Sequence, residues 1–204
     1  MQPIATAGKT LSSGLDFSKS GVVLIAAPLA PQDLAQIEAF FPVLPPRTAG
    51  ARAEDFTAEA RAWFAGHEGL RALASQLAEM PVRLSRLQAF DKSPEANWFV
   101  PWHQDRAEDG RERPVEALED TVALRIHLDD SGENNGPLEV ILGSHTSGRL
   151  EADAIARVVA GAELVACYAV RGNIVAMRPL LLHRSKRASK PDARRVIHIE
   201  FRPE

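Results

Sequence analysis

Cysteine and long hydrophobic runs are both scarce in this sequence. Cys167 is the single cysteine among 204 residues, so no disulfide bond can form within the chain, and we expect a cytoplasmic location. The apolar run over residues 22–30 is far too short to cross a bilayer. Asp16 and Lys19 precede it, where a signal peptide would carry a basic segment. We therefore expect neither a disulfide scaffold nor membrane insertion or export.

The chain also lacks a sustained basic stripe. Its formal net charge is −3, and acidic and basic residues are interspersed, which argues against nucleic acid as a partner. Hydrophobic residues make up 45% and charged residues 25%, which is ordinary for a folded globular protein. The length suits one domain over residues 1–204, with a core large enough to enclose a cavity for a small-molecule substrate.

Helical periodicity dominates the first part of the chain. Residues 1–20 are expected to form an irregular lead-in, and the β-branched run at 21–25 predicts a first strand. Apolar residues recur at helical spacing over 31–41, where Pro42 ends the pattern. They recur again over 54–80, where Gly66 and Gly69 break the pattern into two helices. Residues 31–80 are therefore expected to be mostly helical.

Short strands dominate the rest of the chain. Apolar residues between 82 and 128 lie in short, partly alternating segments, and further strands are expected near 138–142, 164–167, 173–177 and 195–201. Residues 151–159 are expected to form a helical insertion. Helices followed by many short strands predict an α+β, mainly β chain. Its strands, over 82–202, would form a sandwich or jelly roll with the N-terminal helices packed on it.

Residues 102–105 carry the first sign of chemistry. Residues two apart on an extended segment point to the same side, so His103 and Asp105 can share one metal ion. His183, just past the apolar run at 174–177, fits as a third ligand from a distant strand. Two histidines and a carboxylate form the facial triad typical of iron(II) oxygenases, although these ligand types also admit zinc.

Arg194 follows His183 by eleven residues, at the start of a segment that reads as a strand. A guanidinium there can bind the distal end of a dicarboxylate through two parallel hydrogen bonds. The order His-x-Asp, distal His, then Arg resembles the phytanoyl-CoA dioxygenase-like (PhyH) family of Fe(II)- and 2-oxoglutarate-dependent oxygenases. Residues 136–145, which end in Gly-Ser-His, are also similar to that family, so the resemblance covers roughly residues 84–202.

This resemblance implies a double-stranded β-helix, which is a cupin-like jelly roll. It implies that His103, Asp105 and His183 bind Fe(II). It also implies that Arg194, helped by Ser185, binds the C5 carboxylate of the co-substrate 2-oxoglutarate, with O2 as the second co-substrate. The expected reaction is hydroxylation of a small organic substrate with release of succinate and CO2. Related halogenases carry a small residue in place of Asp105, so this carboxylate favours hydroxylation.

Several further residues near these motifs have open interpretations. Gln88 and Arg125 could reach the co-substrate or the substrate, although polar residues on strands commonly face solvent. Three aromatic residues beside the metal motif could form a substrate wall or belong to the core: Trp98, Phe99 and Trp102. Trp102 is the favoured wall residue because it adjoins the metal motif. Ala188 stands where the family commonly has Asn, which affects the expected co-substrate contacts.

The remaining histidines near the site are left outside the triad. His127 is expected to be a half-buried strand histidine satisfied by a neighbour. His145 is expected to fix a turn, and His198 either lines the cavity or packs in the core. The charge run at 106–113 would form a solvated loop or, given its place after the metal motif, a mobile lid.

Two other functions remain open at this point. A cupin-like binding module would keep the fold and a metal but bind a ligand without turnover. A metal-dependent hydrolase or isomerase would use zinc or iron as a Lewis acid and would need no anchor for 2-oxoglutarate. The complete ligand set together with Arg194 favours the oxygenase. Both a monomer and a homodimer fit the sequence, which shows no heptad pattern.

Overall fold

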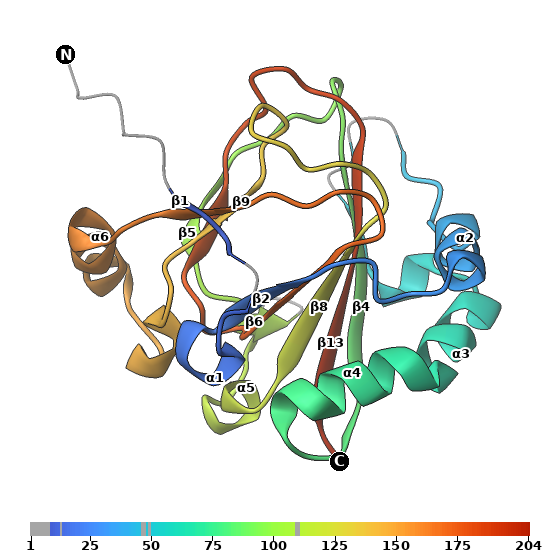
Figure 1. The fold of residues 1–204 in the computed structure, drawn as a ribbon, viewed down its shortest axis with the longest axis horizontal. Helices are drawn as coiled ribbons and strands as arrows, with labels where there is room; N and C mark the ends of the chain where they lie inside the picture. The colour runs from blue at the N-terminus through green and yellow to red at the C-terminus, as the bar shows by residue number, and fades with distance from the viewer. Residues whose placement is uncertain (1–8, 13, 46–47, 49, 109–110) are drawn as a thin grey trace.

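Two β-sheets form the body of the protein (Figure 1). The structure, a computed structural model, describes residues 9–12, 14–45, 48, 50–108 and 111–204. The larger sheet has the strand order β2 (Val22–Ile25), β11 (Ile174–Met177), β8 (Val122–His127), β13 (Arg194–Pro203), β4 (Val82–Lys92) and β3 (Gly50–Ala51). The smaller sheet has the order β1 (Lys9–Thr10), β10 (Val165–Cys167), β9 (Leu138–Val140), β12 (His183–Ser185) and β5 (Val100–His103). A separate hairpin pairs β6 (Ala107–Glu108) with β7 (Arg111–Glu112).

These sheets form the predicted double-stranded β-helix. Their strands are mostly antiparallel, and the chain after β4 passes repeatedly between the two sheets: β4, β8, β11 and β13 lie in the larger sheet, and β5, β9, β10 and β12 lie in the smaller one. The ladder between β13 and β4 is the longest and runs from the Arg194–Lys92 pair to the Pro203–Val82 pair. Among the described residues no ladder closes the two sheets into a continuous barrel. A pocket between the two sheets is partly open to solvent.

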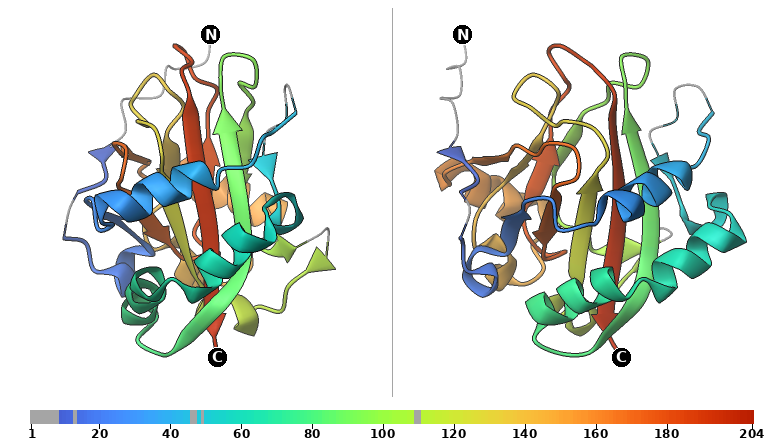
Figure 2. Two further views of the ribbon diagram at one scale, coloured as in Figure 1. Left: turned by 90° about the vertical axis from the view of Figure 1, so that its right-hand side faces the viewer. Right: turned by 45° about the vertical axis from the view of Figure 1, so that its right-hand side comes forward.

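Three helices cover the outer face of the larger sheet: α2 (Pro31–Ala39), α3 (Ala58–Gly66) and α4 (Glu68–Ala78) (Figure 2). Pro31 begins α2, where its missing N–H costs nothing. The Thr57 hydroxyl caps α3, and the His67 ring caps α4 by accepting from the backbone N–H of Leu70 at 3.1 Å. The predicted break between two helices therefore falls at His67, with the two glycines that suggested it close by on either side.

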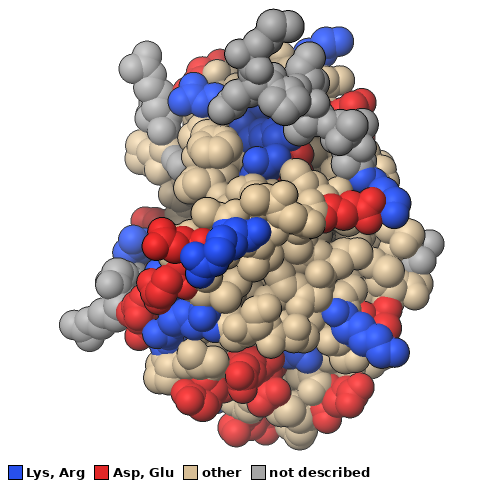
Figure 3. Space-filling model, turned by 90° about the vertical axis from the view of Figure 1, so that its left-hand side faces the viewer, with Lys and Arg blue, Asp and Glu red and all other residues tan. Residues whose placement is uncertain are grey.

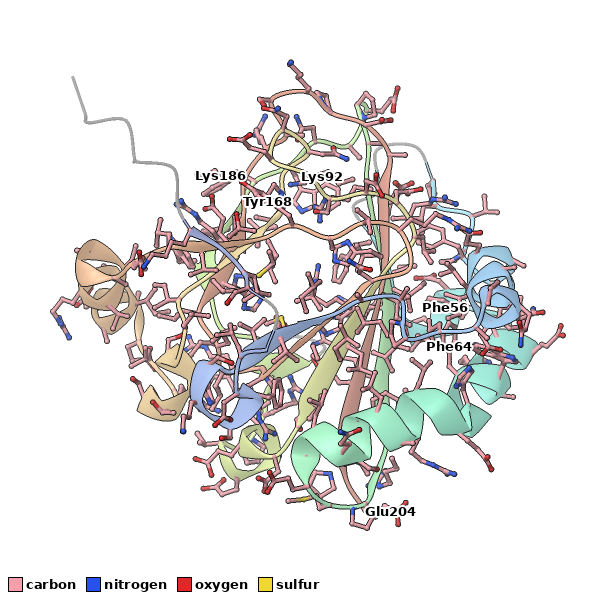
Figure 4. All side chains as sticks on the ribbon, in the orientation of Figure 1. Phe56, Phe64, Lys92, Tyr168, Lys186 and Glu204 are labelled. Carbon is pink, nitrogen blue, oxygen red and sulfur yellow. The ribbon has the colours of Figure 1, made fainter. Side chains whose placement is uncertain are left out.

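The buried faces of these helices and of the larger sheet make one hydrophobic cluster. In Figure 4, Phe56 and Phe64 lie between the helices and the sheet, and both are buried in that cluster. Alternate residues of β8, such as Leu124 and Ile126, pack into it from the sheet. The other residues of β8, including Arg125, must then point between the two sheets, because side chains alternate along a strand. That inner face carries most of the polar residues of the site.

The other helical segments are short or peripheral. They are α1 (Phe17–Ser20), α5 (Glu116–Glu119), α6 (Ala152–Gly161) and the 3-10 turns η1 (Ala53–Asp55) and η2 (Ser144–Ser147). The helix predicted over 151–159 is thus present as α6. The lead-in is less irregular than expected, because it holds β1 and α1. Asp16 caps α1 by accepting from the backbone N–H of Ser18, and Gly21 ends it with a φ of 73°.

Charge is mixed on the surface. On the face drawn in Figure 3, acidic and basic side chains are interspersed and form no continuous basic patch. Within the part of the chain that the structure describes, no helix is both long enough and apolar enough to cross a membrane.

Candidate metal centre and anion pocket

His103, Asp105 and His183 converge between the two sheets. His103 at the end of β5 is the cross-strand partner of His183 at the start of β12, and their ring centroids are 4.1 Å apart. Asp105 lies just beyond β5, where its backbone N–H donates to the carbonyl of Pro179 at 2.8 Å. Its two carboxylate oxygens each lie 3.5 Å from Nε2 of one histidine. One ligand atom from each residue lies within 4.8 Å of the others, so a single ion can contact all three.

The histidine rings are oriented for a metal. Nδ1 of His103 lies 2.8 Å from the carbonyl of Pro101, and Nδ1 of His183 lies 2.9 Å from the carbonyl of Leu181. A carbonyl only accepts, so each Nδ1 must carry the proton, and each Nε2 presents its lone pair to the centre. Such a backbone partner is what fixes the tautomer of a metal-binding histidine. The residues present therefore fit a divalent ion.

The protonation states of His183 and Asp105 also fit a divalent metal ion. Burial and the neighbouring His103 lower the pKa of His183 to about 3, so this ring stays neutral. Burial alone would raise the pKa of Asp105, but the contact with the His103 ring, whose own pKa this contact raises, holds the pKa of Asp105 well below its usual value. A neutral imidazole and an anionic carboxylate are the forms that bind a metal.

A second cluster of possible ligands lies beside the first and includes Asp105, His198 and Glu200. Glu200 is fully buried and is already bound by two guanidinium groups: Arg86 at 3.1 Å and Arg113, which also donates to the backbone carbonyl of Asp105 at 2.7 Å. Its charge is therefore neutralised by protein. We assign Glu200 a structural role, which is to hold Arg113 and thereby the segment that carries Asp105.

Replacing Glu200 with leucine should destabilise the fold strongly, because it leaves Arg86 and Arg113 without their buried counter-charge. We expect the free energy of unfolding to fall by about 3–5 kcal/mol, as when one partner of a buried ion pair is removed. Urea denaturation of the metal-free protein measures this. The matched control is Glu38→Leu, which breaks a more exposed pair with Arg171 and should cost at most about 1 kcal/mol. Equal losses in the two variants would contradict the structural role.

Arg194 lies at the distal end of the same pocket, as predicted. It is 4% exposed, and among the described residues it pairs with no carboxylate. Its Nη2 donates to the Ser185 hydroxyl at 3.3 Å, and its Nε has no partner in the described part of the chain. Burial and the nearby Arg125 lower its pKa to about 10, so it remains a cation at neutral pH. A buried cation without a counter-charge is costly and indicates an anionic ligand.

Lys92 completes this end of the pocket, and the sequence analysis missed it. It is the cross-strand partner of Arg194, is fully buried, and donates to the Ser185 hydroxyl at 3.0 Å and to the Lys186 carbonyl at 2.5 Å (Figure 4). Ser185 in turn donates to the carbonyl of Gly136 at 2.9 Å. Its hydroxyl thus accepts from both cations and has no hydrogen left for a ligand, so it orients the cations. The missed signal was strand parity, because Lys92 lies an even number of residues after Gln88.

A pocket of about 540 Å³, partly open to solvent, joins the two ends. Its lining includes the three metal-binding candidates together with Gln88, Arg125, Ser185, Arg194 and His198. Every site residue predicted from the sequence is therefore brought to one cavity. Gln88 and Arg125 face inward rather than toward solvent, and His198 lines the cavity. The Ala188 backbone is held by two hydrogen bonds to the Asn97 side chain, at 2.7 and 2.9 Å.

The predicted substrate wall is wrong in one respect. Trp98 lines the pocket, but Trp102 does not, and its ring lies under the guanidinium of Arg184 at 4.7 Å. The reason is the alternation along β5, which turns Trp102 away when His103 points inward. Phe99 is half exposed and does not line the pocket either.

Two other predictions need correction or qualification. His127 is buried, but neither ring nitrogen has a partner in the described part of the chain, whereas a satisfied histidine was expected. Burial and the nearby Arg125 lower its pKa to about 3, so it remains neutral. In the charge run at 106–113, Arg106 donates to the carbonyl of Leu150 at 2.9 Å, and Arg149 donates to Glu112 at 3.0 Å. These contacts hold the hairpin to the body, while residues 109–110 of the predicted lid lie outside the described residues.

The chain is similar to known proteins in both sequence and structure. L-proline trans-4-hydroxylase from Streptomyces griseoviridis is 31% identical over 160 residues, which is 63% of this chain and 58% of the relative. This chain therefore spans less than two thirds of that relative's length. The crystal structure of AviO1 from Streptomyces viridochromogenes Tue57 is similar with a TM-score of 0.73 and 27% identity, covering 91% of each chain.

A third comparison supports the fold alone. EctD from S. alaskensis, solved with 2-oxoglutarate and 5-hydroxyectoine, has a TM-score of 0.74 and 17% identity, covering 100% of this chain and 81% of that one.

The sequence profile of the family described as phytanoyl-CoA dioxygenase (PhyH) matches residues 17–196, which is most of the chain. The protein, with its two histidines, one aspartate and distal arginine around one pocket, therefore belongs to the phytanoyl-CoA dioxygenase (PhyH) family.

Proposed function

We propose that this protein is a non-haem Fe(II)- and 2-oxoglutarate-dependent dioxygenase that hydroxylates a small organic substrate. One observation carries the proposal: His103, Asp105 and His183 converge on one point of a pocket whose other end holds the buried guanidinium of Arg194, which pairs with no carboxylate among the described residues. A 2-oxo dicarboxylic acid has the complementary chemistry, with a chelating group at one end and a carboxylate at the other. The match to a named hydroxylase is consistent with this reaction class.

Each residue then has a definite task. His103, Asp105 and His183 would hold the iron, and Arg194 would bind the distal carboxylate of 2-oxoglutarate, with Lys92 beside it and Ser185 orienting both cations. Iron(II), when bound, supplies the redox centre at which O2 and 2-oxoglutarate are consumed, with succinate and CO2 as co-products. Arg194 and Ser185 are buried, and charge interactions are stronger at buried positions than in bulk water. Asp105 supplies the carboxylate that related halogenases replace with a small residue, which favours hydroxylation over halogenation.

The experiment that tests this function is an anaerobic titration of the Fe(II)-loaded protein with 2-oxoglutarate. A weak visible charge-transfer band is expected when the 2-oxo acid chelates the iron. Iron binding without any band would leave the metal centre in place but reject the co-substrate. A Lewis-acid enzyme or a cupin-like binding module would then be the better description. A band without succinate formation in air, across a broad set of small substrates, would favour the binding module.

Lys92 should make co-substrate binding depend on pH. Burial, with Arg194 and Arg187 nearby, lowers its pKa to about 7, so the ammonium is charged below pH 7 and loses its proton above it. A charged Lys92 attracts the dicarboxylate, so the affinity for 2-oxoglutarate should fall roughly threefold to tenfold as the pH rises from 6 to 8.5. The charge-transfer titration measures this at each pH. The slope should be lost in Lys92→Met, and a slope that persists there would assign it to another group.

Location and assembly are further proposals. A cytoplasmic location is supported by the single thiol, which is buried and whose pKa burial raises to about 12, so it is not suited to disulfide chemistry. We expect a monomer or a homodimer acting on a small molecule, without nucleic acid or membrane. Sedimentation of the purified protein distinguishes the two assembly states.

A further inference from the structure

Arg125 is a second buried guanidinium in the pocket, at the metal end. It lies on β8 opposite His198 of β13, whereas Arg194 lies four residues earlier on β13, opposite Lys92. At about 3.3 Å per residue, this separates the two levels by roughly 13 Å along the strand. Arg125 is 9% exposed, lines the pocket, and lies 5.3 Å from the centre of the Phe90 ring. The two arginines therefore enter the cavity from different levels of the larger sheet.

The polar partners of Arg125 leave most of its hydrogen-bonding capacity free. Its Nη1 donates to Nδ1 of His198 at 3.2 Å, and the other ring nitrogen of His198 faces Glu200 at 3.4 Å. His198 thus positions the guanidinium without neutralising it. The Nε of Arg125 has no partner in the described part of the chain, and Arg125 forms no ion pair there. Burying a cation in this way is costly unless a ligand supplies the counter-charge.

The nearby carboxylates do not supply that counter-charge. Asp105 acts on Arg125 electrostatically, but no ion pair joins them, and the charge of Asp105 is needed by the metal. Glu200 is already neutralised by Arg86 and Arg113. Among the described residues that line the pocket, Arg125 therefore has no anion of its own.

The charge of 2-oxoglutarate does not cover Arg125 either. One of its two carboxylates is matched by Arg194, with Lys92 beside it. The other is matched by the iron, whose two positive charges exceed the single negative charge of Asp105 by one. At the metal end of the pocket the charges of the iron, Asp105 and the chelating carboxylate then cancel, and Arg125 is left there without a counter-charge. One further negative charge, placed near the metal, remains to be supplied.

We propose that Arg125 binds a carboxylate of the primary substrate, so that the substrate is a small organic acid held with its reactive carbon near the iron. This inference rests on the proposed oxygenase function and deepens it. A planar guanidinium with free N–H groups matches a carboxylate through paired hydrogen bonds. His198 is the positioning residue for this group, because it fixes the guanidinium through Nη1.

The first arm of the test asks whether Arg125 serves the co-substrate instead. Fe(II)-loaded wild-type protein and Arg125→Gln are titrated anaerobically with 2-oxoglutarate, and the charge-transfer band is followed. Both should show the band, with dissociation constants that differ by less than about threefold. A loss of tenfold or more in the variant would overturn the proposal, because it would assign Arg125 to the co-substrate. Absence of the band in the wild type would instead reject the oxygenase function itself.

The second arm probes the substrate carboxylate directly with acetate, using acetamide as the matched neutral control. Each is added to the protein loaded with Fe(II) and 2-oxoglutarate, and broadening of its methyl proton resonance by the paramagnetic iron is recorded at constant ionic strength. Acetate should show saturable broadening with the wild type, and acetamide should show none. Arg125→Gln should weaken acetate binding by about tenfold or more, as expected for loss of a charged hydrogen bond.

Two controls keep this arm decisive. Arg125→Lys retains the charge in the same place and should recover part of the acetate binding, while thermal melts show whether each variant is folded. Acetate that does not saturate with the wild type, or that binds equally well to Arg125→Gln, would overturn the proposal. Equal broadening by acetate and acetamide would also overturn the proposal, because it would show that the site does not distinguish a charged ligand from a neutral one.

Discussion

Replacing His183 with alanine is expected to weaken Fe(II) binding by roughly 100-fold or more and to abolish turnover. This is the larger of the losses expected from the histidines, because His183 is 3% exposed and its ring is held by the Leu181 carbonyl. The substitution removes one of the three proposed protein ligands. Changes to residues that merely support a metal ligand already cost 10–100-fold in affinity, so removal of a ligand should cost at least as much. Equilibrium dialysis against Fe(II), or against Co(II) in air, measures the affinity.

The matched control is His145→Ala. That residue lies in η2, its ring contacts the backbone carbonyl of Ser18 at 3.1 Å, and it does not line the pocket. Its loss should leave the metal affinity within about twofold of the wild type, because no metal ligand is touched. Retention of full Fe(II) affinity by His183→Ala would place the ion elsewhere, with Asp105, His198 and Glu200 as the next cluster to examine.

The candidate metal centre could be predicted in part because its signal is local. His103 and Asp105 are two residues apart on an extended segment, and this spacing alone puts both on one side of the chain. His183 and Arg194 were found from their order along the chain and from the resemblance to a family. The structure brings both to the same pocket because β12 pairs with β5 and β13 begins close to the end of β4. The pairing of these strands therefore brings His183 and Arg194 to the pocket, as the order of the motifs along the chain suggested.

Other parts of the site could not be read from sequence because they depend on pairing between distant strands. Lys92 becomes a site residue only because it pairs with Arg194 across a ladder. Glu200 looks like a metal ligand by type, and only its two arginine partners show that it is structural. Trp102 was favoured because it adjoins the metal motif, but neighbours on a strand point in opposite directions. Adjacency in sequence was misleading there, and parity was the better guide.

The charges of the pocket suggest how it selects its ligands. Most interiors exclude unpaired cations, yet this one keeps Lys92, Arg125 and Arg194 without carboxylate partners in the described part of the chain. Before ligands bind, burial and the repulsion from neighbouring cations lower the pKa of Lys92 and of Arg194. Binding of anions removes this repulsion. The fold thus stores part of the free energy that favours the co-substrate, and ligand binding should stabilise the protein against unfolding.

Replacing Arg194 with methionine should therefore weaken 2-oxoglutarate binding by roughly 100- to 1000-fold while leaving Fe(II) binding nearly unchanged. The guanidinium supplies the only buried arginine at the distal end among the described residues of the pocket lining, and loss of a desolvated charge pair costs about 2–5 kcal/mol. Methionine fills a similar volume, so the loss should not come from a collapsed pocket. The charge-transfer titration gives the affinity, and equilibrium dialysis gives the metal occupancy of the same sample.

Thermal melts with and without 2-oxoglutarate distinguish a loss of co-substrate binding from a loss of folding. Removing a buried, uncompensated cation should make the ligand-free Arg194→Met protein at least as stable as the wild type, because the repulsion with Lys92 disappears. In the presence of 2-oxoglutarate the wild type should gain melting temperature and the variant should not. Arg195→Met is the matched control, because Arg195 pairs with Asp129 on the outer side of the same strand and should leave co-substrate affinity intact. A variant at residue 194 that binds 2-oxoglutarate like the wild type would remove the distal anchor from the proposed function, and the Lewis-acid alternative, which needs no such anchor, would then account for the metal centre.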